Sequence, residues 1–394
     1  MNNNDFDEQI SIAIIGPLGP PQLNCLRSWK KRGYKVLYIY LGESKKSNKR
    51  LQSLADYVYD LHDIYKNEDD LLEECYKLCI KHSIQNITAV SYKHIGFLHK
   101  LKAKHSLSIN VLGIDESLLE FVESKHQQYA VAKDCGFDMS ETWELDSNNY
   151  NNVPEEAFPL VVRPDGTGGV TPSFKVEYIR NVEELRDRFD KIKSLHRPLI
   201  AQSFIDGRNV VAHGIRYKND GEFVFQGFEV GCMLDGVAIT INSIKIPDSI
   251  INSCKRFCSK MGIYGAFHFD LRHCSKSGKY FFLEINARLG GTTGKVFQLG
   301  FDEPGYLVDS YSSAPVDSYR YNACESKAVA SNRYAIVQSV IKKMLGKTTV
   351  FDYPECGRLS YLFLMIKGVF FWKDELFSLR RLYSSYVYFM DRFK

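Results

Sequence analysis

The sequence predicts an α/β protein with an alternating N-terminal part, followed by a strand-rich α+β part. Apolar runs at residues 11–15 and 87–92 enclose a segment, residues 69–83, whose apolar side chains recur at helical spacing, as in a parallel sheet with covering helices. From residue 158 to 291, strand-like runs broken by glycine follow one another. A chain of 394 residues is long enough for two or three lobes.

The N-terminal part begins with a strand, a Gly/Pro turn at residues 16–21, an amphipathic helix and a second strand. The turn lacks the GxGxxG spacing of dinucleotide-binding loops, so we expect its Gly and Pro residues only to shape the turn. Tyr92 and His94 follow the fourth strand at its carboxyl end. Sheets of this kind bind ligands there, although a plain surface loop has the same appearance.

Two further segments separate the lobes. Residues 115–137 have a helical pattern that ends at Gly136, a plausible helix cap. Residues 147–158 are polar and contain Pro154, which is typical of a linker. We therefore expect one helix and then a linker before the strand-rich part begins.

The C-terminal segment is basic and aromatic. Residues 327–394 hold 12 Lys and Arg against 5 Asp and Glu, and their longest apolar run is interrupted by Lys367. That run is too short to span a membrane. Two interpretations stay open: a helix over residues 359–371 that packs on the core, or a surface that contacts an anionic membrane or an anionic polymer.

Composition limits the class of function. The formal net charge of +4 is too small to indicate a nucleic-acid partner. The 10 cysteines form no CxxC pair, and the first residues lack a basic and apolar signal pattern. We therefore expect reduced thiols and a cytoplasmic location.

Residues 279–291, KYFFLEINARLGG, contain the polar cluster that points to chemistry. Glu284, Asn286 and Arg288 alternate with apolar residues, so an extended backbone places them on one face. An SKSG turn joins this strand to FHFDLR, so a hairpin pairs Asp270 with Glu284. Two carboxylates and an amide oxygen suit Mg²⁺, and Arg288 can meet an anion. The alternative for each charged residue alone is an ordinary ion pair.

Residues 159–170, PLVVRPDGTGGV, form a second motif. A buried strand carries Arg163, and Gly166, Gly168 and Gly169 follow in a loop whose N–H groups can approach phosphate oxygens. The GK[ST] ending of a Walker A loop is absent. Alone, the loop fits a plain hairpin turn equally well.

Taken in their order along the chain, these motifs resemble those of the ATP-grasp superfamily of carboxylate ligases, over about residues 12–310. EINAR is similar to the family signature E-x-N-x-R, and FHFDLR to the acidic strand before it. The resemblance, which includes the large chain of carbamoyl phosphate synthetase, implies an ATP-grasp fold with ATP between the last two lobes. It implies a Rossmann-like N-terminal lobe at residues 1–115 and an ATP-grasp domain at residues 116–315, whose small central lobe covers about residues 150–205. A helical basic extension would follow at residues 316–394.

The resemblance also implies site residues. Asp270, Glu284 and Asn286 would bind Mg²⁺, or Mn²⁺ in its place. Lys125, on the helix before the small lobe, and Arg163 would bind the phosphates of ATP. Arg163 occupies a position where the family commonly has Lys. An arginine binds phosphate through two N–H donors of its planar guanidinium, whereas a lysine acts as a point charge.

The segment LIAQSFIDG resembles the hinge that reads adenine through its backbone. Gln202 stands where the family often has Glu, and Arg208 and Asn209 stand where an acidic ribose contact is common. The hinge residues that the resemblance assigns to nucleotide binding are Gln202, Ser203, Phe204 and Ile205.

The implied activity is that of an ATP-dependent carboxylate-amine ligase. ATP would phosphorylate an acid, an amine would attack the acylphosphate, and Lys125, Arg163 and Arg288 would stabilise the developing charge. The acid is a small molecule or is carried on a polymer; a homodimer stays open, as do the identities of acid and amine. The alternative from another class is a nucleotide-binding regulatory protein with this fold and no ligase activity.

Overall fold

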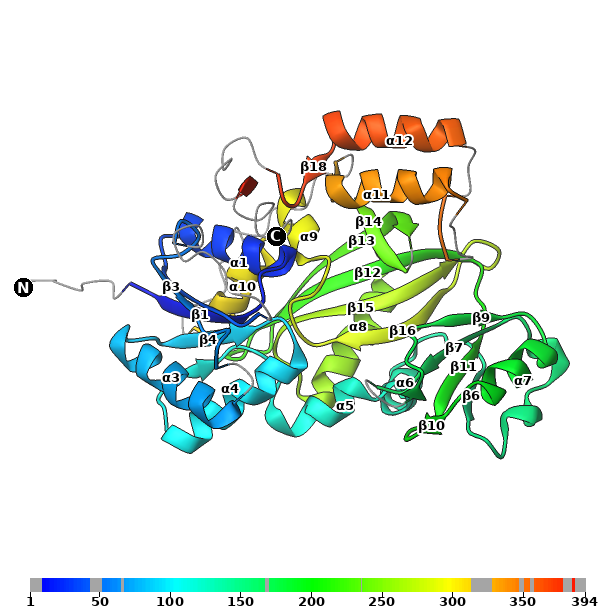
Figure 1. Ribbon diagram of the computed structural model, residues 1–394, viewed down its shortest axis with the longest axis horizontal. Helices are drawn as coiled ribbons and strands as arrows, with labels where there is room; N and C mark the ends of the chain where they lie inside the picture. Colours follow the sequence, from blue (N-terminus) through cyan, green and yellow to red (C-terminus); the bar gives the residue numbers. More distant parts are fainter. Residues whose placement is uncertain are drawn as a thin grey trace, which may run out of the picture.

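The chain forms an N-terminal lobe, a large central sheet and a small lobe that lies against one end of this sheet (Figure 1). This computed structural model describes residues 9–42, 52–64, 67–166, 170–234, 236–312, 328–346, 351–354, 358–377 and 385–386. All three parts mix strands with helices, as the sequence predicts. The candidate site lies where the small lobe meets the central sheet.

The N-terminal lobe contains a parallel sheet of five described strands, in the order β3-β2-β1-β4-β5. All six residues of β1 are buried, because Ile12 and Ile14 pack into one core cluster and Ala13 and Ile15 into another. The bounds are β1 Ser11–Gly16, α1 Pro20–Lys31, β2 Lys35–Tyr40, β3 Tyr57–Asp60, α3 Glu68–Lys81, β4 Asn86–Ala89, α4 Tyr92–His105 and β5 Asn110–Val111.

The continuous helix predicted for residues 115–137 is wrong, because the chain breaks it at Ser124. This residue has an extended backbone, with φ −90° and ψ 112°, and its side chain accepts a hydrogen bond from the backbone of Gln127. A serine in this conformation is a good N-cap, so it starts a new helix. The segment contains η1 Glu116–Leu118, α5 Leu119–Glu123 and α6 Lys125–Asp134, which makes Lys125 the first residue of α6.

The small lobe is a four-stranded sheet in the order β6-β11-β7-β9, with α7 packed on it. Its core is apolar and includes Leu160, Val162, Leu185 and Leu199, all fully buried. The polar segment predicted as a linker lies within this lobe and forms two short turns. The bounds are β6 Thr142–Leu145, η2 Tyr150–Asn152, η3 Glu155–Ala157, β7 Leu160–Pro164, β8 Val170–Thr171, β9 Glu177–Ile179, α7 Val182–Asp190, β10 Ser194–Leu195 and β11 Leu199–Ser203.

The central sheet has seven described strands, in the order β16-β15-β12-β13-β14-β17-β18. Its antiparallel core matches the run of strands that the sequence predicts, except that β14 was not predicted. The bounds are β12 Gly207–Arg216, β13 Phe223–Leu234, β14 Val237–Ile244, α8 Asp248–Met261, β15 Gly265–Cys274, β16 Tyr280–Asn286, α9 Thr293–Leu299, α10 Glu303–Asp309, β17 Val329–Ser331, α11 Arg333–Met344, α12 Arg358–Phe370 and β18 Lys373–Asp374.

The C-terminal segment joins this architecture through β17, β18 and a buried polar anchor. The carboxylate of Glu375 is buried and accepts hydrogen bonds from Lys295 Nζ at 3.0 Å and Asn332 Nδ2 at 2.7 Å. Arg27, on α1, donates to the backbone carbonyls of Glu375 and Leu376 at 3.0 and 2.8 Å. The segment therefore connects the central sheet to the N-terminal lobe.

Phe282 holds β16 in the core, since its ring lies 5.3 Å from that of Phe137 and 5.9 Å from that of Phe257. We expect Phe282→Ala to lower the free energy of unfolding by about 3–5 kcal/mol, because it leaves a cavity in a fully buried cluster. Urea unfolding measures this loss. Ile80→Ala, at a side chain that is 58% exposed, is the control, with an expected change within about 0.5 kcal/mol. Equal losses in both variants would contradict the assignment.

Candidate active site

The hairpin of β15 and β16 carries the acidic residues. Asp270 pairs with Glu284, and His268 with Asn286, which confirms the register that the sequence predicts. The register shifts after Asp270, so the strands are irregular beside the carboxylates. Arg288 lies two residues beyond the end of β16.

The two carboxylates converge on one point. Asn286 Nδ2 donates to Asp270 Oδ2 and to Glu284 Oε1, both at 3.2 Å, so the amide occupies the position from which a cation could contact both. Burial and the negative charge of Glu284 raise the pKa of Asp270 to about 8. Burial also acts to raise the pKa of Glu284, but Arg163 and Lys125 outweigh it and lower that pKa. Of the two carboxylates, Glu284 therefore has the lower pKa and is the more readily ionised.

Lys125 and Arg163 approach Glu284 from the small-lobe side. Lys125 Nζ lies 3.6 Å and Arg163 Nη1 3.7 Å from Glu284 Oε2. The structure thus brings together the two predicted cations and a predicted metal ligand. Arg163 Nη2 is held in place by Tyr129 Oη, by Gln202 Oε1 at 3.1 Å and by the Leu283 carbonyl at 2.9 Å.

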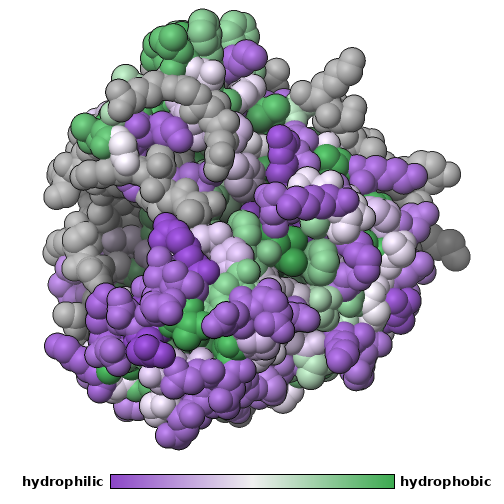
Figure 2. Space-filling model, turned by 90° about the vertical axis from the view of Figure 1, so that its right-hand side faces the viewer, coloured by the Kyte–Doolittle hydropathy of each residue, from purple (hydrophilic) through white to green (hydrophobic). Residues whose placement is uncertain are grey.

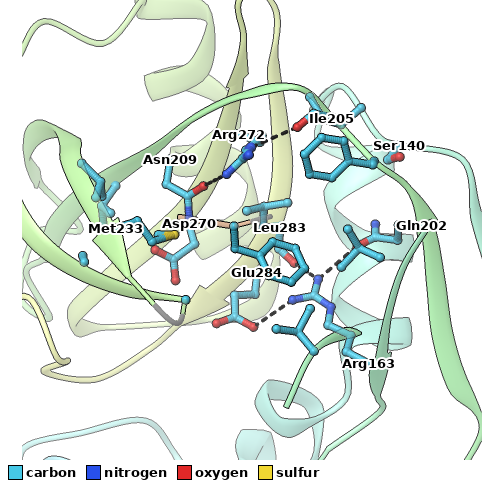
Figure 3. A pocket seen from close by; sticks show the side chains of 18 of the residues that line it. Ser140, Arg163, Gln202, Ile205, Asn209, Met233, Asp270, Arg272, Leu283 and Glu284 are labelled. Atoms are coloured by element: carbon cyan, nitrogen blue, oxygen red, sulfur yellow. Dashed lines mark hydrogen bonds and ion pairs between the residues drawn. The ribbon is translucent and has the colours of Figure 1, made fainter. Parts of the chain in front are cut away.

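Asp270, Glu284 and Arg163 line a cavity of about 300 Å³, a volume within the range of small-molecule sites. Figure 3 shows Asp270 and Glu284 on one wall, with Arg163 and Gln202 facing them from the small lobe. Apolar side chains from the central sheet complete the cavity. Among its lining residues are Val161, Ser203, Phe204, Ile205, Val211, Val230, Met233, Leu283, Thr292 and Phe351.

The predicted hinge forms one rim of this cavity. The Ser203 carbonyl accepts from Ser140 Oγ at 2.6 Å, and the Ile205 carbonyl accepts from Arg272 Nε at 3.0 Å. Within the described residues, the Phe204 carbonyl and the Ile205 N–H have no hydrogen-bond partner. These two backbone groups are therefore available to a ligand.

Both residues at the expected ribose position already have partners, although Asn209 also lines the cavity. Arg208 Nη1 forms an ion pair with Glu229 at 2.9 Å, and the Asn209 side chain accepts a hydrogen bond from Arg272 (Figure 3). The Gln202 side chain is 4% exposed and is occupied by Arg163 and Tyr129. The side chains of the hinge thus support one another rather than point into open space.

Of the glycine loop, Gly166 is described, whereas Gly168 and Gly169 lie outside the described residues. Gly166 has φ +87°, a conformation that glycine adopts without strain. The preceding residue, Asp165, was not predicted as part of the site. Its carboxylate accepts from the Lys125 N–H at 2.6 Å and from Ser124 Oγ at 3.0 Å, so the loop caps the helix that carries Lys125.

We expect Asp165→Ala to weaken ATP binding and to lower the free energy of unfolding by about 1–2 kcal/mol, because the Lys125 N–H and Ser124 Oγ at the start of α6 lose their acceptor. Asn181→Ala is the matched control, since Asn181 caps α7 through the Glu184 N–H at 2.9 Å, and Asn181 does not line the cavity. Calorimetric titration with Mg·ATP and urea unfolding measure both effects. If both variants lose stability and neither changes the ATP affinity, Asp165 has no role in the site.

The N-terminal lobe contributes Tyr92. Its hydroxyl accepts from the Ala287 N–H at 2.7 Å, and the Arg288 guanidinium lies 4.9 Å from the centre of its ring. Of the two residues predicted at the carboxyl end of the fourth strand, Tyr92 therefore contacts the candidate site. His94 Nδ1 is hydrogen-bonded to Ser91 at 2.8 Å. His268 is buried and stacks on His213, and burial lowers its pKa well below the usual value.

A buried polar chain behind the site was not predicted from the sequence. His213 Nδ1 lies 2.7 Å from Glu303 Oε1, and His213 Nε2 lies 2.9 Å from Thr292 Oγ1. This chain fixes the hydroxyl of Thr292, which lines the cavity. Thr292 and Glu303 lie 79 and 90 positions after His213 along the chain, so no local sequence pattern indicates these contacts.

The carboxylate oxygens of Asp270 and Glu284 fit a divalent cation such as Mg²⁺, which binds through one or two carboxylates and retains several waters. The Asn286 side chain turns its Nδ2 toward both carboxylates and its Oδ1 toward Arg288, so its amide would have to rotate to add an oxygen ligand. Among the described residues, no group of three or more His, Cys, Asp and Glu could hold a metal ion. A set of two carboxylates and an amide would leave coordination positions for phosphate oxygens. The donor chemistry therefore suits a cation shared with a nucleotide.

Comparison with known proteins adds fold-level support. No family model and no curated protein matches the sequence. Among solved structures, the chain is similar to the biotin carboxylase domain of 2-oxoglutarate carboxylase from Hydrogenobacter thermophilus, in a complex with MgADP, ADP and bicarbonate. That match has a TM-score of 0.66 at 15% identity and covers 82% of this chain and 74% of the other.

Two other solved structures are similar at 15% identity. L-amino acid ligase from Bacillus licheniformis matches with a TM-score of 0.61, over 82% of this chain and 78% of the ligase. N5-carboxyaminoimidazole synthetase from Staphylococcus aureus matches with a TM-score of 0.62, over 86% of each chain. The chain has the ATP-grasp fold that these enzymes share, as the ordered motifs predict.

Proposed function

We propose that the protein is an ATP-dependent carboxylate-amine ligase that forms an amide or peptide bond through an acylphosphate. One observation carries the proposal: Asp270 and Glu284 line the cavity and both accept a hydrogen bond from Asn286, and Lys125 and Arg163 lie beside Glu284. Cations that offset the phosphates and oxygen ligands that hold Mg²⁺ are the two requirements of phosphoryl transfer. The similarity to enzymes crystallised with ADP supports the choice of nucleotide.

The hinge supports an adenine site. Adenine presents a donor and an acceptor on one edge, and the Phe204 carbonyl and Ile205 N–H complement such an edge. Apolar residues such as Val211, Val230 and Met233 line the same cavity and would cover a flat ring. The proposed orientation places the base at residues 202–205 and the phosphates toward Glu284.

The site residues have different roles in the proposed reaction. Mg²⁺ held by Asp270, Glu284 and Asn286 would neutralise charge on the phosphates. Lys125 and Arg163 bind the phosphates and stabilise the charge that develops as the γ-phosphoryl group moves to the acid. Arg288, stacked on Tyr92, lies on the opposite side of Asn286 and stabilises the anionic intermediate that forms when the amine attacks. Phosphate then leaves.

We propose a second cavity, of about 1080 Å³, as the site of the acid. It lies at the carboxyl ends of the N-terminal strands, since Pro17 follows β1, Gly42 follows β2 and Tyr92 begins the helix after β4. Its lining carries charges of both signs: Lys93 and Arg197 could meet a carboxylate, whereas Glu120 and Glu123 could meet a cationic group. Because Tyr92 contacts Arg288, this cavity borders the proposed site of acyl transfer.

A screen for ADP release with pools of carboxylic acids and amino acids tests the proposal. The ligase proposal requires at least one acid and amine pair to increase ADP release above that with ATP alone. The alternative is a regulatory protein that binds the nucleotide without turnover; the hinge side chains that hold one another and the presence of Arg163 favour it. Calorimetric binding of ATP without release in any pool would select that alternative.

A further inference from the structure

The outer surface of α11 and α12 is unusually apolar. Its large hydrophobic residues are between 38% and 79% exposed, and in the rest of the described chain only Ile80, Val237 and Tyr386 are comparable. The pair lies at the edge of the molecule, and Figure 2 shows hydrophobic residues gathered at the same end. We define the apolar face as Val337, Ile341, Met344, Leu345, Leu359, Leu362, Phe363, Ile366, Phe370 and Phe371.

The spacing along α12 shows that this exposure is one-sided. Leu359, Phe363 and Phe370 belong to the outward stripe, whereas Tyr361 is fully buried against the core. Gly368 also faces inward, because a Cβ there would lie 2.3 Å from Ile336 of α11. Packing on α11 therefore accounts for the inner side of α12 and leaves the stronger apolar side without a partner in the described chain.

Among the described residues of this segment, the exposed charges are all positive. Lys342, Lys367 and Lys373 are exposed, and Lys343 Nζ lies 4.9 Å from the ring centre of Tyr361. The acidic residues described in the same segment, Asp352, Asp374 and Glu375, are all buried, at 6%, 4% and 1% exposed. The described part of the segment therefore places cations, and no exposed carboxylate, beside the apolar residues. A second copy of this face would bring like charges together, whereas an anionic partner would complement them.

We propose that the apolar face docks on the surface of an anionic phospholipid membrane. Helices with Phe and Leu on one face and Lys beside it lie in the interface between headgroups and acyl chains. Anionic headgroups attract the lysines, while the apolar side chains lose their exposure to water. None of the described helices is long and apolar enough to cross the bilayer, so the contact is with the surface.

A short segment of the chain links the helices of the apolar face to the candidate active site. Phe351 lines the cavity and belongs to the chain between α11 and α12, and the Tyr353 hydroxyl accepts a hydrogen bond from the Asn209 N–H at 3.1 Å. The same short segment thus connects the apolar face to the rim of the cavity. The inference concerns this surface alone and is independent of the proposed ligase activity.

Sedimentation of the full chain with vesicles tests the inference. We expect the protein to pellet with mixed phosphatidylglycerol and phosphatidylcholine vesicles at low salt, and much less with phosphatidylcholine alone. Binding should weaken as salt is raised, because exposed charges are screened. Failure to pellet with the anionic vesicles at low salt would overturn the proposal.

Two variants assign the binding to this face. Phe363→Glu inserts a charge into the apolar stripe and should abolish pelleting, whereas Ile80→Glu, in α3, should not. Lys367→Glu should weaken binding at least about fivefold, the effect of one cation at an anionic surface; Lys77→Glu, also in α3, should weaken it less. Circular dichroism checks that all four variants are folded.

The competing outcome is a dimer formed through the same face. Light scattering during size-exclusion chromatography measures the molar mass of the protein without lipid. A dimer that Phe363→Glu converts to a monomer, together with no vesicle binding, would replace the membrane with a second copy. Pelleting that persists unchanged in Phe363→Glu and Lys367→Glu would show that another surface binds the lipid.

Discussion

The Glu284→Gln variant is expected to lose Mg·ATP-dependent turnover by more than about 100-fold, because one metal ligand loses its charge. Glu284 is also the common ion-pair partner of Lys125 and Arg163, so neutralising it removes the charge that holds both cations beside the cavity. The rate of ADP release at saturating Mg²⁺ and ATP measures the loss. Circular dichroism and thermal unfolding are expected to show a folded protein.

The matched control is Glu177→Gln. Glu177 lies in β9, pairs with Arg188 at 2.8 Å, and its side chain is 31% exposed, close to the 28% of Glu284. It does not line the cavity. Normal turnover in this variant would show that removing a paired strand carboxylate is not in itself inactivating. If Glu284→Gln released ADP as fast as the wild type, the metal assignment would be wrong.

The Arg288→Met variant is expected to lower kcat by about 10²–10³, the effect of removing one preorganised donor to a developing negative charge. ATP affinity should change little, because Arg288 lies on the far side of Asn286 from Lys125 and Arg163 in the hydrogen-bonded cluster. Steady-state kinetics and calorimetric titration with Mg·ATP separate the two quantities.

Tyr92→Phe is the control for Arg288. It keeps the ring beneath the guanidinium and removes only the hydroxyl that accepts from the Ala287 N–H. Loss of one hydrogen bond is worth about 0.5–1.5 kcal/mol, so the rate should fall no more than about tenfold. A weaker ATP affinity with an unchanged kcat in Arg288→Met would instead place this residue in the nucleotide site.

The sequence was informative wherever the chain itself fixes geometry. The short turn between β15 and β16 predicts the hairpin that brings the two acidic residues together. The turn alone would pair Asp270 with Leu283, and the register shift between Asp270 and Leu271 places Asp270 opposite Glu284 instead. The order of motifs predicted the ATP-grasp fold even at 15% identity to the solved structures. The roles of the individual site residues stay predictions that the variants above test.

The sequence was least informative where separate lobes meet. The contact of Tyr92 with Arg288 and the hydrogen bond from the Lys125 N–H to Asp165 depend on how the lobes dock. The link from Glu303 to His213 joins residues 90 positions apart in one lobe, so it depends on tertiary packing. The helical spacing of apolar residues also does not show whether the apolar side of a helix packs on the protein or faces outward. On α12 the stripe typical of a packed helix faces outward, and Tyr361 and Gly368 make the packing contact.

The transfer of oxygen from the acid to phosphate tests the central claim most directly. An acid that stimulates ADP release in the screen is labelled with oxygen-18 in its carboxylate and incubated with Mg·ATP, the amine and the protein. If the acid is activated as an acylphosphate, mass spectrometry will find one labelled oxygen in each released phosphate. Phosphate without label, alongside formation of the amide product, would contradict this account.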